Sequence, residues 1–206
     1  MQPAVRNAWR RFNESLEGLT SWMYLDIKGL VTTGMGNLID PVAAALALTW
    51  FDASDVQASP DQVRAEWNRI KNNHALAHQG AQAAKAVATL HLQDADINTL
   101  ILGKLDQNEA ILKANPAFED IDAWPADAQL ALLSMAWAMG PGFGPHFPHF
   151  SHACAARDFA AAADECAMDV VGNPGLIRRN AANRQAFRFA ANAADPTVLQ
   201  SRVPPL

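Results

Sequence analysis

Apolar residues near the start of the chain recur at intervals of three or four positions. Within residues 3 to 19 this spacing holds for Val5, Ala8, Trp9, Phe12, Leu16 and Leu19. It is typical of an α-helix with one buried face. From residue 22 to 38 the pattern changes to alternation, and glycines stand at positions 29, 34 and 36. This second pattern predicts a small antiparallel meander with tight turns.

The chain after Pro41 is predicted to be helical almost throughout. Ser59 and Pro60 form a helix start, because serine caps a helix and proline fits its first position. Further helices are expected over residues 74 to 89, 94 to 114, around 150, 158 to 169 and 178 to 194. Residues 125 to 139 are apolar nearly all round, which indicates a central buried helix. The predicted architecture is α+β with a minor sheet near the N-terminus.

Composition and charge narrow the possible functions. The chain has 206 residues, of which 50% are hydrophobic, so we expect one compact domain with a substantial core and at most two lobes. The formal net charge is -5, with 16 basic and 21 acidic residues and no basic block. Nothing in this balance favours binding to nucleic acid or to an anionic membrane.

Neither a membrane span nor a signal peptide is predicted. The longest apolar stretch, residues 41 to 51, is too short to cross a bilayer. Arg10 and Arg11 interrupt any apolar core of a signal peptide near the N-terminus. We therefore expect no membrane insertion and synthesis in the cytoplasm, with another system delivering the protein if its substrate lies outside. Two cysteines are too few for a disulfide framework.

Two carboxylates near the N-terminus stand in contrasting surroundings. Cleaving a glycosidic bond needs one carboxylic acid that stays protonated and a second carboxylate that stays charged. Glu17 ends an apolar helix, where desolvation would favour the protonated acid. Asp26 lies in a polar hairpin with Lys28 close by and should stay ionised. Thr32 follows on the next strand, where its hydroxyl could hold a water, and the nearby glycines let a polymer approach.

The order of these residues is more specific than their types. The active-site signature of the phage-type lysozymes, glycoside hydrolases that cut peptidoglycan, resembles position for position the series Glu17-Gly18-Leu19, Tyr24, Asp26, Gly29, Thr32, Gly34 and Gly36. The resemblance extends to the far end of the chain. Residues 127 to 140 look like that family's central buried helix, and Asn183-Arg184 looks like the Asn-Arg pair of its last long helix.

The resemblance implies a single lysozyme-like catalytic domain over residues 1 to 206, with two lobes flanking a substrate cleft. The small sheet lobe would span about residues 18 to 92, and the larger helical lobe residues 1 to 17 and about 93 to 200. The small lobe is longer than the family usually needs, so we expect a helical insertion over about residues 41 to 91. Asn37 stands where the family often has His, which is expected to remove a structural salt bridge.

Roles follow from the resemblance at the matching positions. Glu17 would be the general acid, Asp26 the base or charge stabiliser, and Thr32 the residue that positions the attacking water, in an inverting reaction. Arg184 would hydrogen-bond Glu17. Substrate binding would involve Leu38, Trp137 and Arg184, with the first two lining the sugar cleft. The expected reaction is hydrolysis of the β-1,4 bond between N-acetylmuramic acid and N-acetylglucosamine, by a monomer, without metal or cofactor.

Histidines and a glycine-rich turn have simpler interpretations. The segment 34 to 36 does not resemble a phosphate-binding loop, because no helix or lysine follows it. His74 and His78 stand four apart, but Ala75 occupies the place where a zinc protease requires Glu. A zinc site is a weaker possibility in the run of His146, His149, His152 and Cys154. Prolines at 145 and 148 favour an irregular loop in which these side chains diverge.

Two further pairs remain. Lys104 and Glu109 are interpreted as a solvated face of the long helix. Cys154 and Cys166 lie on successive helices that turn back on each other in the resembling fold, so the two could pair. Small apolar filling of the core is the commoner use of such cysteines.

Two rival functions stay open. A catalytically silent peptidoglycan-binding module is disfavoured because Glu17, Asp26 and Thr32 are present together. A lytic transglycosylase needs the acid but no second carboxylate, so Asp26 disfavours it. The expected setting is either a phage endolysin released through a holin or an injected antibacterial effector or tail module, the latter with an immunity protein as partner. In both cases the protein would act on peptidoglycan glycan strands, in the periplasm or at the cell wall.

Overall fold

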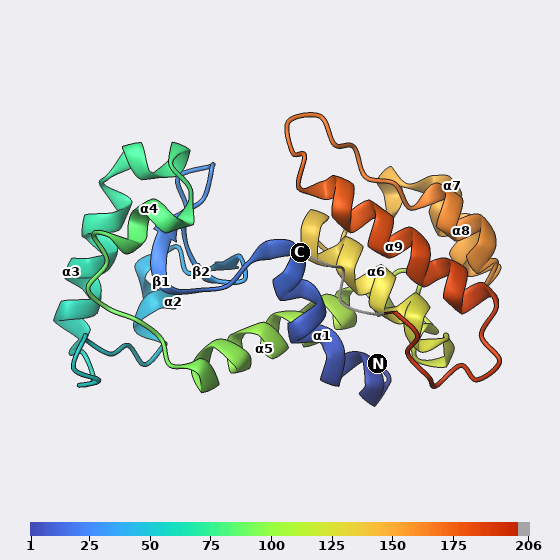
Figure 1. The fold of residues 1–206 in the computed structure, drawn as a ribbon, viewed down its shortest axis with the longest axis horizontal. Coiled ribbons are helices and arrows are strands. Elements are labelled where there is room, and N and C mark those ends of the chain that lie inside the picture. Colours follow the sequence, from blue (N-terminus) through green and yellow to red (C-terminus); the bar gives the residue numbers. More distant parts are fainter. Residues whose placement is uncertain (202–206) are drawn as a thin grey trace. The chain divides into compact units, whose positions relative to one another are not determined.

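The first helix and the meander after it form at the positions predicted from the sequence. In the computed structural model, which describes residues 1–201, α1 spans Pro3–Glu17 and buries an apolar face that includes Trp9. The strands are β1 (Thr20–Leu25), β2 (Val31–Gly34) and β3 (Asn37–Leu38). They form an antiparallel sheet in the order β1-β2-β3 (Figure 1).

The chain forms two compact units. The first spans Glu17–Leu102, and the second combines Met1–Leu16 with the chain from Gly103 onward. Helix α1 ends at one boundary, and α5 (Asp94–Lys113) has residues on both sides of the other. The predicted domain 1 to 206 includes residues 202 to 206, which lie outside the described part of the chain. Among the described residues, no helix is long and apolar enough to cross a membrane.

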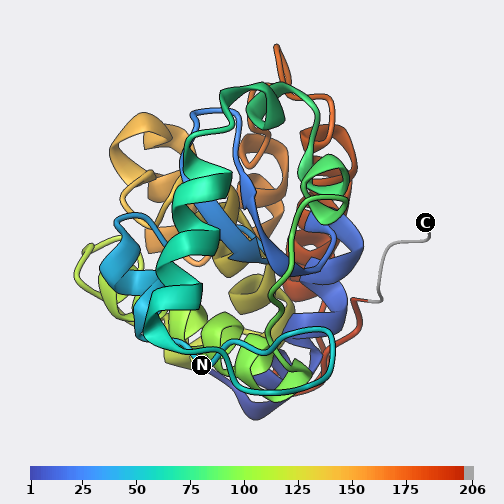
Figure 2. The same cartoon turned by 90° about the vertical axis from the view of Figure 1, so that its left-hand side faces the viewer.

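Short helices of the first unit pack against its sheet. Helix α3 (Pro60–Lys71), the 3-10 helix η1 (His74–His78) and α4 (Ala81–Lys85) all contact β1. Figure 2 shows α3 running in front of the strands. The fourth helix described in this unit before α5, α2 (Val42–Leu46), packs against α3.

Local sequence signals explain where α3 begins and where the next segment breaks. Ser59 Oγ accepts a hydrogen bond from Gln62 N at 3.3 Å, and Gln62 Oε1 accepts one from Ser59 N at 2.8 Å. These two bonds form a capping box. The continuous helix predicted over residues 74 to 89 is wrong, because Gly80 takes a φ of +78° and separates η1 from α4.

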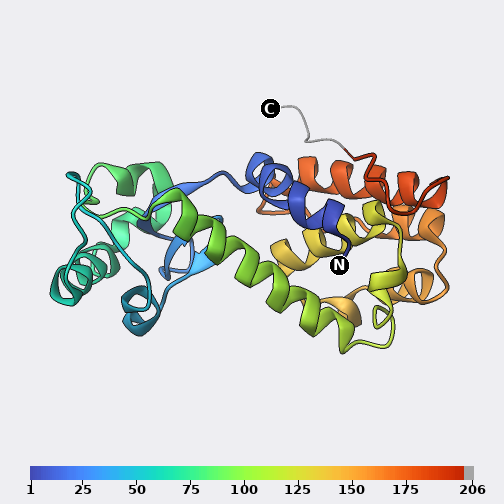
Figure 3. The same cartoon turned by 90° about the horizontal axis from the view of Figure 1, so that it is seen from below.

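The second unit is built around α6 (Ala126–Met139). Every residue of α6 from Ala126 to Trp137 is buried, as the all-round apolar pattern predicts. Helix α9 (Leu176–Ala191) packs along α6, and α8 (Phe159–Glu165) packs against α9 (Figure 3). The remaining described helices of this unit are α7 (Pro148–Ala155), η2 (Ile121–Ala123) and η3 (Gly144–His146).

Candidate active site

One face of the sheet carries three residues singled out in the sequence, two from the lysozyme-like signature and one that follows it. Tyr24 pairs with Thr32 across β1 and β2, and Thr32 pairs with Leu38 across β2 and β3. Directly paired residues project their side chains to the same face of a sheet, so the three form a row. Thr32 is buried, Tyr24 is half-buried and Leu38 is 54% exposed. The row therefore opens to solvent at its β3 end.

Asp26 lies two residues after Tyr24, in the turn that joins β1 to β2. Its Oδ1 accepts hydrogen bonds from the backbone N–H groups of Lys28 and Leu30, both at 2.9 Å. The backbone closes the same turn, because Asp26 N donates to Leu30 O at 3.0 Å and Gly29 N donates to Asp26 O at 2.9 Å. These bonds fix the orientation of the carboxylate and leave Oδ2 without a hydrogen bond among the described residues.

Glu17 is the last residue of α1, and its side chain is exposed. Gly18 takes a φ of +74°, the left-handed conformation that commonly ends a helix. The carboxylate therefore stands at an open helix end instead of among apolar side chains. The desolvation that we expected for Glu17 is wrong, because its side chain is exposed.

The hydroxyl of Tyr24 is electrostatically coupled to both carboxylates. The pKa of Tyr24 is raised to about 12, first by burial and then by the negative charges of Glu17 and Asp26. A carboxylate shifts the pKa of another group in this way only from a short distance. The fold thus brings Glu17, Tyr24 and Asp26 into one neighbourhood, beside the row that continues to Thr32.

Thr32 has a hydroxyl whose proton is already used. Its Oγ1 donates a hydrogen bond to Leu30 O at 3.2 Å, and the residue is 4% exposed. A hydroxyl has one donor and two acceptor positions, so the acceptor positions are the ones that a water could still occupy. A water that donates to Thr32 keeps its own lone pairs for attack. This geometry suits the role predicted for Thr32, which stays a prediction.

The other predicted site residues, Trp137 and Arg184, lie in the second unit. Trp137 is 6% exposed, and its ring centroid lies 5.4 Å from that of Trp9. Arg184 is exposed on α9, and its Nε donates to Ala163 O at 3.4 Å. The sugar contacts predicted for Trp137 and Arg184, and the predicted hydrogen bond from Arg184 to Glu17, stay predictions.

Lys104 and Glu109 of α5 have intramolecular partners, so the solvated face predicted for them is wrong. The Nζ atom of Lys104 lies 4.1 Å from the ring centroid of Trp137, which is a cation–π contact. Glu109 Oε1 pairs with the Met1 amino group and with Lys113 Nζ, the latter at 2.9 Å. Both side chains therefore contribute to contacts within the second unit.

Sequence reasoning missed Arg179, the buried arginine of α9. It is 1% exposed, and its Nη1 donates to Asn13 Oδ1 at 3.0 Å, Ser134 Oγ at 2.9 Å and Ser134 O at 3.1 Å. Asn13 stands four residues before Glu17 on α1, and residues with this spacing share a helix face. The signal was present in the sequence, because the buried positions of α9 recur at helical spacing as Arg179, Asn183, Ala186, Phe187 and Ala190.

Asn37 links the sheet to α5 through neutral hydrogen bonds. Its Oδ1 accepts from Met35 N at 3.2 Å, and its Nδ2 donates to Leu100 O at 3.2 Å. Gly34 makes room for this side chain, since a Cβ at position 34 would stand 2.7 Å from Asn37 Oδ1. The position predicted to lose a salt bridge is therefore a structural joint of the first unit.

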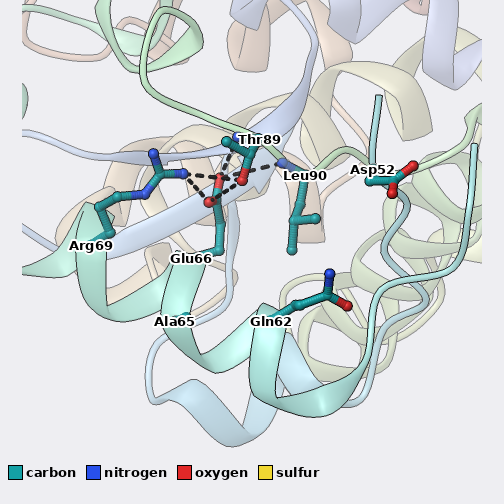
Figure 4. A pocket seen from close by; sticks show the side chains of 7 residues that line it. All are labelled: Asp52, Gln62, Ala65, Glu66, Arg69, Thr89 and Leu90. Carbon is teal, nitrogen blue, oxygen red and sulfur yellow. Dashed lines mark hydrogen bonds and ion pairs between the residues drawn. The ribbon is translucent and has the colours of Figure 1, made fainter. Parts of the chain in front are cut away.

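A cavity of about 340 Å³ lies in the segment predicted as an insertion. Figure 4 shows that Glu66 of α3, one of the residues that line this cavity, points toward Thr89 and Leu90. Its carboxylate accepts from Thr89 N at 2.9 Å, Thr89 Oγ1 at 2.8 Å and Leu90 N at 3.4 Å, and it pairs with Arg69. Glu66 is 3% exposed. All of its hydrogen-bonding capacity is used to hold the 89–90 backbone to α3, so we assign it a structural role.

The histidine run is more regular than predicted. Pro148 occupies the start of α7, where a missing N–H costs nothing, so His149 and His152 lie on a helix and His146 on η3. All three are exposed. In residues 1–201 no group of three or more His, Cys, Asp or Glu side chains could hold a metal ion.

Cys154 and Cys166 are both buried and free. Burial raises the pKa of the Cys154 thiol, and the neighbouring Cys166 raises it further. Burial also raises the pKa of Cys166, to about 11, against the opposing positive charge of Arg184. Thiols held protonated in this way are poor nucleophiles. Both therefore serve as small core residues in this structure.

Comparison of the sequence with models of known protein families gives no match, and comparison with curated proteins finds no relative.

Proposed function

We propose that this protein is a glycoside hydrolase that cleaves the β-1,4 bond between N-acetylmuramic acid and N-acetylglucosamine in peptidoglycan. The observation that supports the proposal is the coupling of Glu17 and Asp26 to one phenol, next to a row that includes Thr32. Two carboxylates of different surroundings are what glycoside hydrolysis needs. The choice of peptidoglycan rests on the resemblance to phage-type lysozymes.

The proposed steps use protein side chains and water. Glu17, at its open helix end, donates a proton to the glycosidic oxygen as the bond from that oxygen to the sugar carbon breaks. A water held by Thr32 adds to the same carbon from the opposite side, and Asp26 Oδ2 accepts the proton that the water loses. The product sugar then has the inverted configuration. Leu38 offers an exposed apolar contact at the end of the same row.

Glu17→Gln tests the proton donor. The amide cannot donate the proton, so we expect cleavage of purified peptidoglycan to fall by at least about 100-fold while the fold is kept. Released reducing ends measure the rate. Glu14→Gln is the matched control, because Glu14 is another exposed carboxylate of α1. Equal activity of Glu17→Gln and Glu14→Gln would remove Glu17 from the mechanism.

Asp26→Asn tests the base without disturbing the turn. The amide oxygen can still accept the two bonds from Lys28 and Leu30, so only the basicity is lost. Mass spectrometry of the wild-type products separates the rivals at the same time. A 1,6-anhydro sugar would indicate a lytic transglycosylase, and binding without any product would indicate a silent wall-binding module.

The proposed setting follows the same resemblance. The protein would reach the periplasm or cell wall by holin release or by injection, and would act on glycan strands as a monomer. An immunity protein encoded beside it would favour the injected effector, and a neighbouring holin would favour the endolysin.

A further inference from the structure

A lysine of the segment predicted as an insertion binds the turn that carries Asp26. Lys71 is the last residue of α3, and its Nζ atom donates a hydrogen bond to Gly29 O at 2.8 Å. Gly29 stands three residues after Asp26, in the turn between β1 and β2. The proposed steps make no use of this bond. It connects the insertion directly to the backbone beside the proposed base.

The carbonyl that Lys71 binds belongs to the same peptide group as a donor to Asp26. In a trans peptide the C=O of one residue and the N–H of the next lie in one plane and point in opposite directions. Lys71 holds the C=O end of the Gly29–Leu30 peptide, and the N–H end donates to Asp26 Oδ1 at 2.9 Å. The position of Lys71 therefore affects how the Leu30 N–H is presented to the carboxylate.

An ion pair holds Lys71 at the other side of the turn. Asp40 Oδ2 lies 2.5 Å from Lys71 Nζ and also accepts a hydrogen bond from Val31 N at 3.2 Å. The exposed fractions of the two side chains are 29% for Lys71 and 15% for Asp40. Hydrogen bonds between charged groups are stronger than neutral ones. The pair therefore contacts the chain at Gly29 and at Val31, on both sides of Leu30.

Helix α3 is fixed to the sheet segment one turn before Lys71. Trp67 Nε1 donates to Ile39 O at 2.9 Å, and Ile39 N donates to Val31 O at 2.9 Å. Trp67 and Lys71 are four residues apart and share a helix face, and Lys71 Nζ lies 5.8 Å from the Trp67 ring centroid. A side chain carried by an anchored helix is placed more precisely than one on a loop.

We propose that Lys71 is a positioning residue, which fixes the Asp26 carboxylate through the Gly29–Leu30 peptide. This inference rests on the proposed hydrolysis, in which Asp26 Oδ2 accepts a proton from the attacking water. A cation bound at the carbonyl polarises the peptide group and strengthens its N–H as a donor. A firmly held Oδ1 limits rotation of the carboxylate, so Oδ2 stays within reach of the water. Lys71 itself forms no bond to the sugar or to that water.

Lys71→Met tests the inference, because it keeps much of the side-chain volume and removes the charged donor. We expect kcat on peptidoglycan to fall about tenfold with KM changed by less than about twofold, because a misplaced base slows the chemical step and leaves substrate binding unaltered. Lys71→Arg keeps a charged donor and should recover part of the loss. Lys85→Met is the matched control and should leave kcat unchanged, since Lys85 of α4 lies 5.0 Å from the ring centroid of Trp22 on the same sheet.

Amide NMR gives a readout that needs no activity. Hydrogen exchange of the Leu30 amide should become at least about tenfold faster in Lys71→Met, because its hydrogen bond opens more often. The amide of Leu92 donates to Ser21 O at 2.8 Å, near the other end of β1, and serves as the reference for overall stability. Its exchange should stay close to the wild-type rate.

The two readouts separate the possible failures. Leu30 exchange that is unchanged, or that accelerates no more than Leu92 exchange, overturns the inference. A Lys71→Met enzyme whose kcat stays within about twofold of wild type also overturns it. If wild-type protein cleaves no peptidoglycan, the proposed function fails, and the Leu30 amide still decides whether Lys71 holds the turn.

Discussion

Two arginines five positions apart on α9 have opposite surroundings. Five residues advance a helix by one turn and a further ~140°, so Arg179 faces the core while Arg184 faces solvent. The buried guanidinium is satisfied by a side-chain amide of α1 and by Ser134 of α6. Such a buried, fully hydrogen-bonded charge holds three helices in register, whereas the exposed one makes a single bond to a carbonyl.

Truncation of these arginines should therefore have unequal effects on stability. Arg179→Ala leaves Asn13 and Ser134 without their partner, and we expect the free energy of unfolding to fall by about 2–3 kcal/mol. Arg184→Ala should change it by less than about 0.5 kcal/mol. Denaturant unfolding measures both. Similar losses in the two variants would contradict the division of α9 described above.

Activity of the same variants addresses Glu17. A strong loss of peptidoglycan cleavage in Arg184→Ala at unchanged stability would support the contact with Glu17 predicted from the resemblance. Unchanged peptidoglycan cleavage in Arg184→Ala would remove Arg184 from the predicted site.

Residue-level prediction succeeded where spacing along the chain was the cause. The alternation predicted an antiparallel meander, and the strands β1 to β3 form there, whereas the shared face of Tyr24, Thr32 and Leu38 became visible only from the strand register. The exposure of Glu17 was not predictable from its apolar neighbours Leu16 and Leu19, because the last residue of a helix can project away from the face that its neighbours bury. The assignment of Arg184 rests on a local Asn-Arg resemblance and stays a prediction, whereas the burial of Arg179 follows from helical periodicity.

At the scale of secondary structure, the residues at helix ends explain which helices form where they were predicted and which do not. Ser59 and Pro60 start α3 where expected, and α6 is buried nearly all round as its composition requires. The segment after α3 was predicted as one helix but forms two, because Gly80 adopts a positive φ. The sequence does not show this, since a glycine can also lie inside a helix with an ordinary φ. Around Pro148 the sequence predicted an irregular loop, but the structure has a helix there, because Pro148 occupies the first position of α7.

Glu66 gives a direct test of how the predicted insertion is held together. Glu66→Gln can keep an amide oxygen against the backbone N–H groups of residues 89–90, but it places the NH₂ against the Arg69 guanidinium and removes the charge that pairs with it. We expect the free energy of unfolding to fall by about 1–3 kcal/mol. Glu119→Gln, an exposed change of the same chemistry, should cost less than about 0.5 kcal/mol. A Glu66→Gln protein as stable as this control would mean that the α3 carboxylate does not anchor the segment.

For the whole molecule, the order of elements follows the hydrophobic pattern, but the division into units does not. One boundary stands at the end of α1, where Gly18 ends the helix, and the other stands within α5, where the helix continues across it. Sequence signals for domain boundaries are flexible, Pro-rich or Gly-rich linkers. A division that runs through a helix leaves no such signal, which is why the unit boundary within α5 requires a structure.

Tyr24 is the only tyrosine of the chain, so the tyrosinate absorbance of the protein reports the ionisation of this one side chain and its effect on stability at alkaline pH. The ultraviolet absorbance that phenolate adds reports this one side chain. Its pKa is about 12 in the folded chain and about 10 once unfolded. Between these values the folded state keeps a proton that the unfolded state has lost, so the stabilisation is complete below about pH 10 and disappears as pH rises through about 12. We expect the absorbance to show a single transition near pH 12 in native protein and near pH 10 in denaturant. A native transition at the lower value would show that the phenol feels neither burial nor the two carboxylates.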